Sequence, residues 1–201
     1  PVCTPWGELY QAVFPDAVPE AWRDGVTLSG QIDRIDLRET PDGVEARILD
    51  YKTNAAAVTP EEAHLARRPP EDAGEAEYRR LDLADGKTLY WRDLQLPLYL
   101  LLLRHVLADE LGVPSGARFS AGYFNLPLEL TATGIARFDA LDDPGALVSA
   151  ARCADAVLER IYRRGVFWPP REARIALFDS GELPTTLFSD PAGQRKREVL
   201  R

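Results

Sequence analysis

Apolar and polar residues alternate along residues 26–37 and again along residues 44–53, as expected for two β-strands that each bury one face. A Pro-Asp-Gly sequence at 41–43 separates them, and this combination is typical of a tight turn. The pattern therefore predicts an antiparallel hairpin. In its second strand the apolar face continues into Asp50 and Lys52, so that face becomes ionic where the strand ends.

Further along the chain, the pattern predicts helices and one more strand. Residues 59–88 are rich in charge with little periodicity beyond a helical turn or two after Pro60, and we expect either a mobile flap or a solvated insertion. A polar tail at 185–201 is a candidate for disorder. The remaining elements are expected to be a short helix at 6–14, a long buried helix at 89–111 with its cap near Asp93, a strand at 118–128 and a second long helix at 144–164.

Composition places limits on the class of protein. A chain of 201 residues with 45% hydrophobic content can form one domain with a real core. Its formal net charge is −8, from 32 acidic and 24 basic residues. A domain that holds nucleic acid by bulk electrostatics needs a basic surface, so any contact with nucleic acid must be local or assisted.

Two cysteines far apart in the sequence indicate neither a zinc site nor a disulfide framework, and we expect a reducing, cytoplasmic location. The most apolar run, residues 94–103, is too short to span a membrane, and no membrane association is expected. The chain begins at Pro1 and contains no methionine. We therefore expect that it is a piece of a longer polypeptide.

The candidate chemistry lies at the end of the hairpin. Asp50 and Lys52 share one strand face, which alone would be an ordinary surface ion pair. Asp33 comes from the paired strand, and two carboxylates that meet there favour a cation between them. Mg²⁺ suits such oxygen ligands, with the backbone carbonyl of Tyr51 a further candidate. Lys52 would orient and help deprotonate an attacking water, or neutralise charge on a phosphate; the number of metals, one or two, stays open.

Three motifs in order extend this picture: Gly-x-Ile-Asp-Arg-Ile-Asp at 30–36, Asp-Tyr-Lys at 50–52 and Gln-x-x-x-Tyr at 95–99. Together they resemble the PD-(D/E)xK nuclease superfamily, and within it the RecB-like branch with the nuclease domains of RecB and AddB helicase–nuclease subunits. The resemblance implies an α/β fold with a restriction-endonuclease-like core, a central mixed β-sheet flanked by helices. It also implies one RecB-like nuclease domain over residues 1–201.

By position in the motifs, the family's two metal-binding acids correspond to Asp33 and Asp50, and its catalytic lysine to Lys52. Gln95 and Tyr99 lie one turn apart on one helix face and would point to the metal site or the DNA backbone. The alternative for these two is a polar pair at the edge of the core.

Asp36 competes with Asp33 for the role of first acid. In a regular strand it faces away from Asp33, so we expect an ion-pair or turn role for Asp36 and a pairing of Arg34 with Asp36 or a neighbouring acid. The lone histidines, His64 and His105, are expected to be structural or solvated rather than metal ligands.

The sequence departs from the family in two respects. Members often carry a histidine or glutamate on a helix before the first strand, where this chain offers only Glu8. AddB-like relatives also hold an iron–sulfur cluster on four cysteines. Cys3 has a suggestive position, but residues 165–184 contain no cysteine, so no iron–sulfur cluster is expected. We predict that Cys153 is a buried helix residue.

These expectations define a Mg²⁺- or Mn²⁺-dependent deoxyribonuclease domain, expected to be an exonuclease, within a helicase–nuclease system of DNA repair and recombination. Its partners would be DNA and a helicase-like subunit or missing parts of the same chain. Arg160, Arg163 and Arg164 are candidate phosphate contacts or a solvated helix end. The alternative from another class is a catalytically silent, nuclease-like interaction or scaffolding module.

Overall fold

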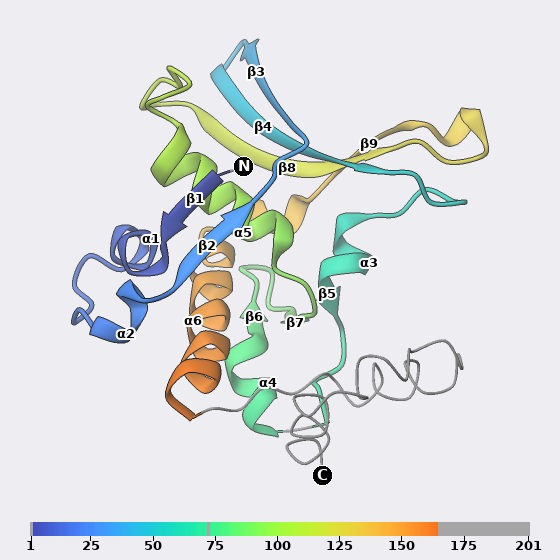
Figure 1. The fold of residues 1–201 in the computed structure, drawn as a ribbon. Coiled ribbons are helices and arrows are strands. Elements are labelled where there is room, and N and C mark those ends of the chain that lie inside the picture. Colours follow the sequence, from blue (N-terminus) through green and yellow to red (C-terminus); the bar gives the residue numbers. More distant parts are fainter. Residues whose placement is uncertain (1, 72, 165–201) are drawn as a thin grey trace, which may run out of the picture. The chain divides into compact units, whose positions relative to one another are not determined.

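The computed structural model describes residues 2–71 and 73–164 (Figure 1). The chain divides into two compact units, Pro1–Leu158 and Glu159–Arg201, and each is described by itself. The second unit contributes the last residues of one helix to the described part of the chain. The predicted tail at 185–201 lies outside the described residues.

A four-stranded mixed sheet lies at the centre of the first unit. In the order β3-β4-β8-β9, β4 runs antiparallel to β3 and parallel to β8, and β8 runs antiparallel to β9. The strands are β3 (Arg34–Thr40), β4 (Gly43–Lys52), β8 (Arg118–Asn125) and β9 (Gly134–Arg137).

The predicted hairpin is confirmed in β3 and β4. Gly43 has a φ of 113°, a conformation that residues with a Cβ rarely adopt, and the Thr40 hydroxyl donates to the Gly43 carbonyl across the turn (2.7 Å). The first strand was expected to be continuous over residues 26–37, but the structure divides it in two. Its beginning is the separate strand β2 (Thr27–Gly30), which pairs with β1 (Val2–Pro5), and residues 31–33 belong to neither strand.

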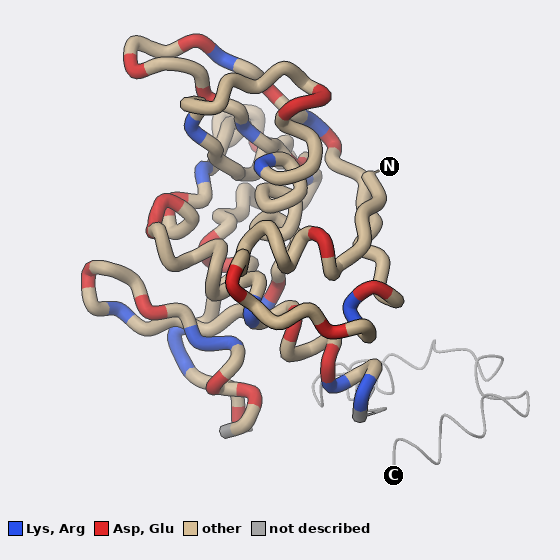
Figure 2. Tube along the Cα trace, turned by 90° about the vertical axis from the view of Figure 1, so that its left-hand side faces the viewer, with Lys and Arg blue, Asp and Glu red and all other residues tan. Residues whose placement is uncertain are grey.

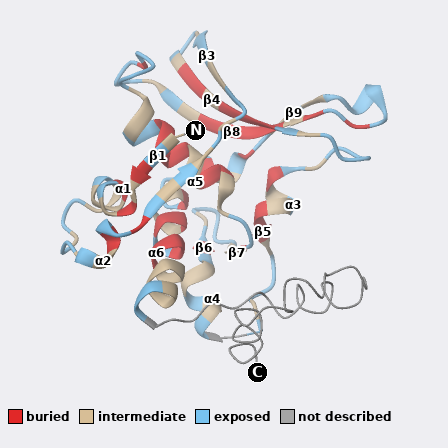
Figure 3. Ribbon diagram, in the orientation of Figure 1, coloured by how far each residue is buried: buried red, intermediate tan, exposed pale blue. Residues whose placement is uncertain are grey.

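Helices cover one face of the sheet. Side chains from α5 (Gln95–Leu102) and α6 (Ala146–Arg164) pack against Ile48 of β4 and Ala121 of β8 in the main core. Figure 3 shows buried positions concentrated on β4, β8 and these two helices. This architecture confirms the expected α/β class with a mixed central sheet flanked by helices.

The long helix expected at 89–111 begins near its expected cap, Asp93, and not at residue 89. Thr88–Trp91 forms strand β7, and α5 starts at Gln95, whose N–H donates to the Asp93 carboxylate (2.6 Å). The helix continues through a π-helical turn, Leu103–Leu107. A short apolar run fits a buried strand as well as a buried helix, which is why the pattern alone misplaced the helix start.

The segment at 59–88 contains the expected helical turn after Pro60, and beyond it regular structure that its sequence did not predict. Leu65 and Leu81 are buried in the main core, so the segment is more than a solvated insertion. Its small antiparallel sheet has the order β5-β7-β6. The elements are α3 (Pro60–His64), β5 (Leu65–Ala66), α4 (Ala73–Arg79) and β6 (Arg80–Asp82).

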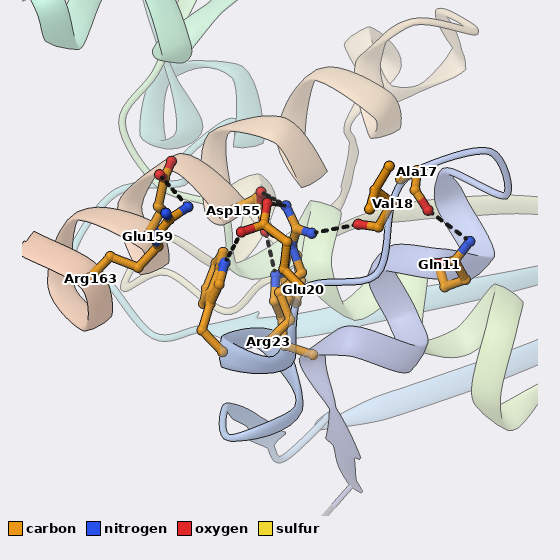
Figure 4. A network of polar contacts seen from close by, with 10 residues as sticks. Gln11, Ala17, Val18, Glu20, Arg23, Asp155, Glu159 and Arg163 are labelled. Carbon is orange, nitrogen blue, oxygen red and sulfur yellow. Dashed lines mark hydrogen bonds and ion pairs between the residues drawn. The ribbon is translucent and has the colours of Figure 1, made fainter.

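A second core cluster joins the N-terminal helices α1 (Trp6–Val13) and α2 (Ala21–Asp24) to α5 and α6. Within it, Arg23 of α2 faces Asp155 of α6, and the two side chains form a buried ion pair with 2.7 and 2.8 Å hydrogen bonds (Figure 4). Two short 3-10 turns complete the described elements, Leu130–Ala132 and Asp139–Asp142.

Candidate active site

The end of β4 carries an acid and a lysine on the face that packs against the core. Ala46 and Ile48 are fully buried on this face, and Asp50 follows with 7% of its surface exposed. Lys52 Nζ lies 2.7 Å from Asp50 Oδ2. The alternation of the strand therefore brings a carboxylate and an ammonium group together at the border between core and solvent.

Asp33 reaches the same place from the bend between β2 and β3. Its Oδ2 accepts a hydrogen bond from the backbone N–H of Tyr51 (3.0 Å), the residue between Asp50 and Lys52. The β3–β4 register pairs Arg34 with Leu49, so Asp33 stands opposite Asp50 one residue beyond the ladder. The interruption of the strand does not move Asp33 away from the position that its sequence predicts.

Helix α5 contributes two further side chains. The Gln95 amide donates to Asp50 Oδ1 (3.3 Å). The Tyr99 ring packs on Gly30, where an added Cβ would come within 2.7 Å of Tyr99 Cε1. Glycine at this position therefore allows the close approach of the ring to the backbone just before Asp33. One helix face thus contacts both Asp50 and the segment that leads to Asp33.

Asp36 and Arg34 are bound elsewhere. Arg34 Nε donates to Asp36 Oδ1 (2.6 Å), and Arg47 Nη2 lies 3.5 Å from the other Asp36 oxygen. The pairing of Arg34 with Asp36 confirms the prediction. In the strand register Asp36 lies opposite Arg47, three residues before Asp50 on β4. Asp36 is therefore farther along the ladder from the end of β4 than Asp33 is.

The oxygens at this site suit a hard divalent cation. Asp50 Oδ2 is buried and makes no hydrogen bond, although Lys52 Nζ is close enough for an ion pair. We regard this contact as electrostatic attraction without hydrogen-bond geometry. A buried carboxylate oxygen without a hydrogen bond fits a ligand that is not a proton donor.

Among residues 2–71 and 73–164, no cluster of three or more His, Cys, Asp or Glu side chains could hold a metal. A cation here would depend on two carboxylates, a backbone carbonyl and other oxygens, which is a common arrangement for Mg²⁺.

Two residues near the site were not expected there. The Tyr123 hydroxyl donates to His64 Nε2 (2.8 Å), and His64 Nδ1 is 2.9 Å from the carbonyl oxygen of Asp93. Lys52 Nζ lies 4.5 Å from the centre of the Tyr123 ring. His64 is fully buried, so its expected role is structural rather than solvated. No sequence motif links these residues, because their contacts arise from the pairing of β4 with β8 and from the folding of the segment at 59–88.

Burial determines the protonation of this pair. It lowers the pKa of His64 below its ordinary value, so the imidazole is neutral. Burial, with the nearby carboxylates of Asp93 and Asp50, raises the pKa of Tyr123. Because a carbonyl oxygen can only accept, His64 Nδ1 carries the hydrogen and Nε2 accepts from the tyrosine.

The other residues that the sequence analysis considered have no contact with the end of β4 among those described above. Glu8 is exposed on α1, Cys3 is exposed, and Cys153 is buried in α6 as predicted. Arg163 pairs with Glu159 within its own helix (3.3 Å). The side chain of Arg164 lies outside the described residues, as does the cysteine-free stretch at 165–184.

No helix in the described part of the chain is long and apolar enough to cross a membrane. No curated protein and no solved structure matches the chain. A family model, that of the PD-(D/E)XK nuclease superfamily, matches residues 6–171, which include the hairpin, α5, β8 and α6. The chain therefore belongs to the PD-(D/E)XK nuclease superfamily.

Proposed function

We propose that this chain is a metal-dependent deoxyribonuclease domain that hydrolyses phosphodiester bonds by attack of water. The observation that carries the proposal is made at the end of β4, in a member of a nuclease superfamily. There Asp33 accepts from the backbone N–H of Tyr51, the residue between the ion-paired Asp50 and Lys52. Acidic oxygens and a cationic side chain at one point are the groups that phosphoryl chemistry requires.

We assign Asp33, Asp50 and the Tyr51 carbonyl to the binding of Mg²⁺ or Mn²⁺. The bound ion would act as a Lewis acid on the phosphate and make a coordinated water more acidic. Gln95 donates a hydrogen bond to Asp50 Oδ1, and Oδ2, which makes no hydrogen bond, is the oxygen that would hold the cation. Tyr99 fixes the backbone that leads to Asp33 by its packing on Gly30.

Lys52 would neutralise negative charge that develops on the phosphate. Its ammonium group lies 2.7 Å from Asp50 Oδ2 and 4.5 Å from the centre of the Tyr123 ring. The other role proposed for Lys52 is to orient the attacking water and help to deprotonate it.

We further propose that the domain is RecB-like and acts as an exonuclease in DNA repair and recombination. The order of its three motifs supports this branch. Its net charge of −8 supports delivery of DNA by a helicase-like partner or by other parts of the protein. Figure 2 shows acidic and basic positions interspersed along the described trace.

Cleavage of single-stranded DNA in Mg²⁺ tests the proposal. Lys52→Ala should lower the single-turnover rate by about 100-fold or more, because one electrostatic contact of the transition state is lost. Lys87 provides a matched control. It follows its partner Asp85 by two residues, as Lys52 follows Asp50, and its Nζ lies 2.6 Å from Asp85 Oδ2 in an exposed turn. Lys87→Ala should keep the wild-type rate.

Removal of the divalent ion with a chelator should abolish cleavage, and its return should restore it. Full activity of Lys52→Ala would reject the assignment of the lysine. A wild-type protein that neither cleaves DNA nor binds Mn²⁺ in calorimetry would be the silent interaction module instead.

A further inference from the structure

A chain of contacts runs beneath Lys52 into the core. The Tyr123 ring faces the ammonium group at 4.5 Å, the Tyr123 hydroxyl donates to His64, and His64 donates to the carbonyl of Asp93. Tyr123 is 2% exposed and His64 is fully buried. Every polar atom of these two side chains therefore has a partner inside the protein.

The same chain returns to the site through α5. The Asp93 carboxylate accepts from the backbone N–H of Gln95, whose side chain donates to Asp50 Oδ1. Asp50 Oδ2 in turn lies beside Lys52 Nζ. The contacts form a closed ring in which Asp50 and Lys52 are each held from two sides.

A buried tyrosine and histidine are a costly means of filling space. Each brings polar atoms into the core that must be satisfied, whereas apolar residues of similar size would not. Leu96, Leu100 and Ile48 fill neighbouring positions of the same core cluster. The polar pair lies where the core meets Lys52, which indicates a purpose beyond packing.

We propose that Tyr123 and His64 are positioning residues that hold the Lys52 ammonium group in place for phosphodiester cleavage. This inference depends on the proposed function. Tyr123 provides the face of an aromatic ring, which attracts a cation within about 6 Å. His64 fixes the plane of that ring by binding its hydroxyl, and the Asp93 carbonyl fixes His64.

The ring would also limit the freedom of a long side chain. Lysine has many rotamers, and holding its ammonium group at one place before the substrate arrives lowers the entropy lost in the reaction. Asp50 alone restrains Lys52 from one side. The aromatic face restrains it from a second side, while 26% of the lysine side chain remains exposed toward solvent.

Three variants separate positioning from stability. Tyr123→Leu removes the ring and should lower the single-turnover rate by about 10- to 100-fold, with DNA affinity unchanged. Tyr123→Phe keeps the ring but not the hydrogen bond to His64, and its single-turnover rate should fall less.

Trp91→Phe is the matched control. It also removes a buried hydrogen-bond donor from the same core cluster, the one that binds Ser149 (3.0 Å), and it keeps an aromatic ring. It should keep the wild-type rate.

A second readout follows Lys52 without metal or DNA. The lysines of the chain are Lys52, Lys87 and Lys196, so ¹³C-methylation of lysine amines gives few NMR signals. The signal of Lys52 should be shifted upfield by the ring current of Tyr123. Tyr123→Leu should remove this shift and Tyr123→Phe should keep most of it.

A wild-type rate in Tyr123→Leu, or an equal loss in Trp91→Phe, would overturn the inference while the proposed function stands. An inactive wild-type protein would instead overturn the proposed function. In that case the lysine signal still reports whether Tyr123 holds Lys52, and a Lys52 signal without an upfield shift would reject the contact itself.

Discussion

At the scale of single residues, the site depends on the different partners of the two Asp50 oxygens. Oδ1 accepts from the Gln95 amide, whereas Oδ2 makes no hydrogen bond and faces the ammonium group of Lys52. A buried carboxylate is stable only when its charge is compensated. Lys52 compensates the charge of the buried carboxylate, and Oδ2 is the oxygen available to the proposed metal ion.

Asp33→Asn tests whether Asp33 contributes charge to that cation. Asparagine keeps an oxygen that can accept from the Tyr51 N–H but has no negative charge. We expect the affinity for Mn²⁺, measured by calorimetry, to fall about tenfold or more, because cation affinity depends on the number of charged ligands. The melting temperature should change little.

Asp36→Asn is the matched control, since Asp36 comes from the same motif but binds Arg34 and Arg47. This variant should bind Mn²⁺ with wild-type affinity. A selective loss of affinity in Asp36→Asn would transfer the metal-binding role to Asp36.

Strand alternation could predict that Asp50 and Lys52 share a face, and the hairpin could predict that Asp33 lies opposite them. The place of Gln95 at the site followed from the resemblance to the nuclease superfamily. The sequence could not predict Tyr123 and His64. Their meeting requires the pairing of β4 with β8, and no local pattern encodes the register of strands so far apart in the chain.

At the scale of elements, α6 is joined to the N-terminal helices through Asp155. Its carboxylate accepts from Trp6 Nε1 of α1 (2.9 Å) and from Arg23 of α2 through two hydrogen bonds. One buried side chain thus satisfies donors from two other elements. Asp155 raises the pKa of Arg23 through the hydrogen bond and its charge.

Asp155→Ala should lower the free energy of unfolding by about 3–5 kcal/mol, measured by urea denaturation, because Arg23 would remain buried without its carboxylate. Asp139→Ala removes an exposed acid that pairs with Arg137 at 3.3 Å. This control should cost less than about 1 kcal/mol. Equal effects of the two substitutions would show that the buried network contributes no more than a surface ion pair.

Elements whose apolar residues follow a single clear period could be predicted from the sequence, and elements without such a period could not. The hairpin and α6 have clear periods and a clear turn or face, and both agree with the structure. Thr88–Trp91 is a short apolar run beside a helix, and its state as strand β7 depends on pairing with β5 and β6. The same dependence on partners concealed the elements within 59–88.

At the scale of the whole molecule, the buried His64 links stability to pH. Burial lowers its pKa in the folded protein, whereas in the unfolded chain the imidazole takes up a proton near its ordinary pKa of about 6.5. As the pH falls below that value, the unfolded state binds more protons than the folded state. The folded state therefore loses stability as the pH falls toward the lowered pKa.

Urea denaturation of the wild type and of His64→Gln at about pH 7.5 and pH 5.5 tests this relation. One unit below the unfolded pKa, the wild type should lose up to about 1.4 kcal/mol more than the variant. His105, whose pKa burial also lowers, is present in both proteins and cancels in the comparison. An identical pH dependence would mean that His64 is not kept neutral by the fold.

The parallel pairing of β4 with β8 has a consequence for synthesis on the ribosome. Parallel neighbouring strands require a long connection, and here the segment at 59–88 and helix α5 lie between β4 and β8 in the sequence. Asp50 and Lys52 are translated well before Tyr123, and contacts between distant segments form late. A nascent chain therefore carries Asp50 and Lys52 before Tyr123 is present, and the candidate active site is complete only after β8 has emerged and paired with β4.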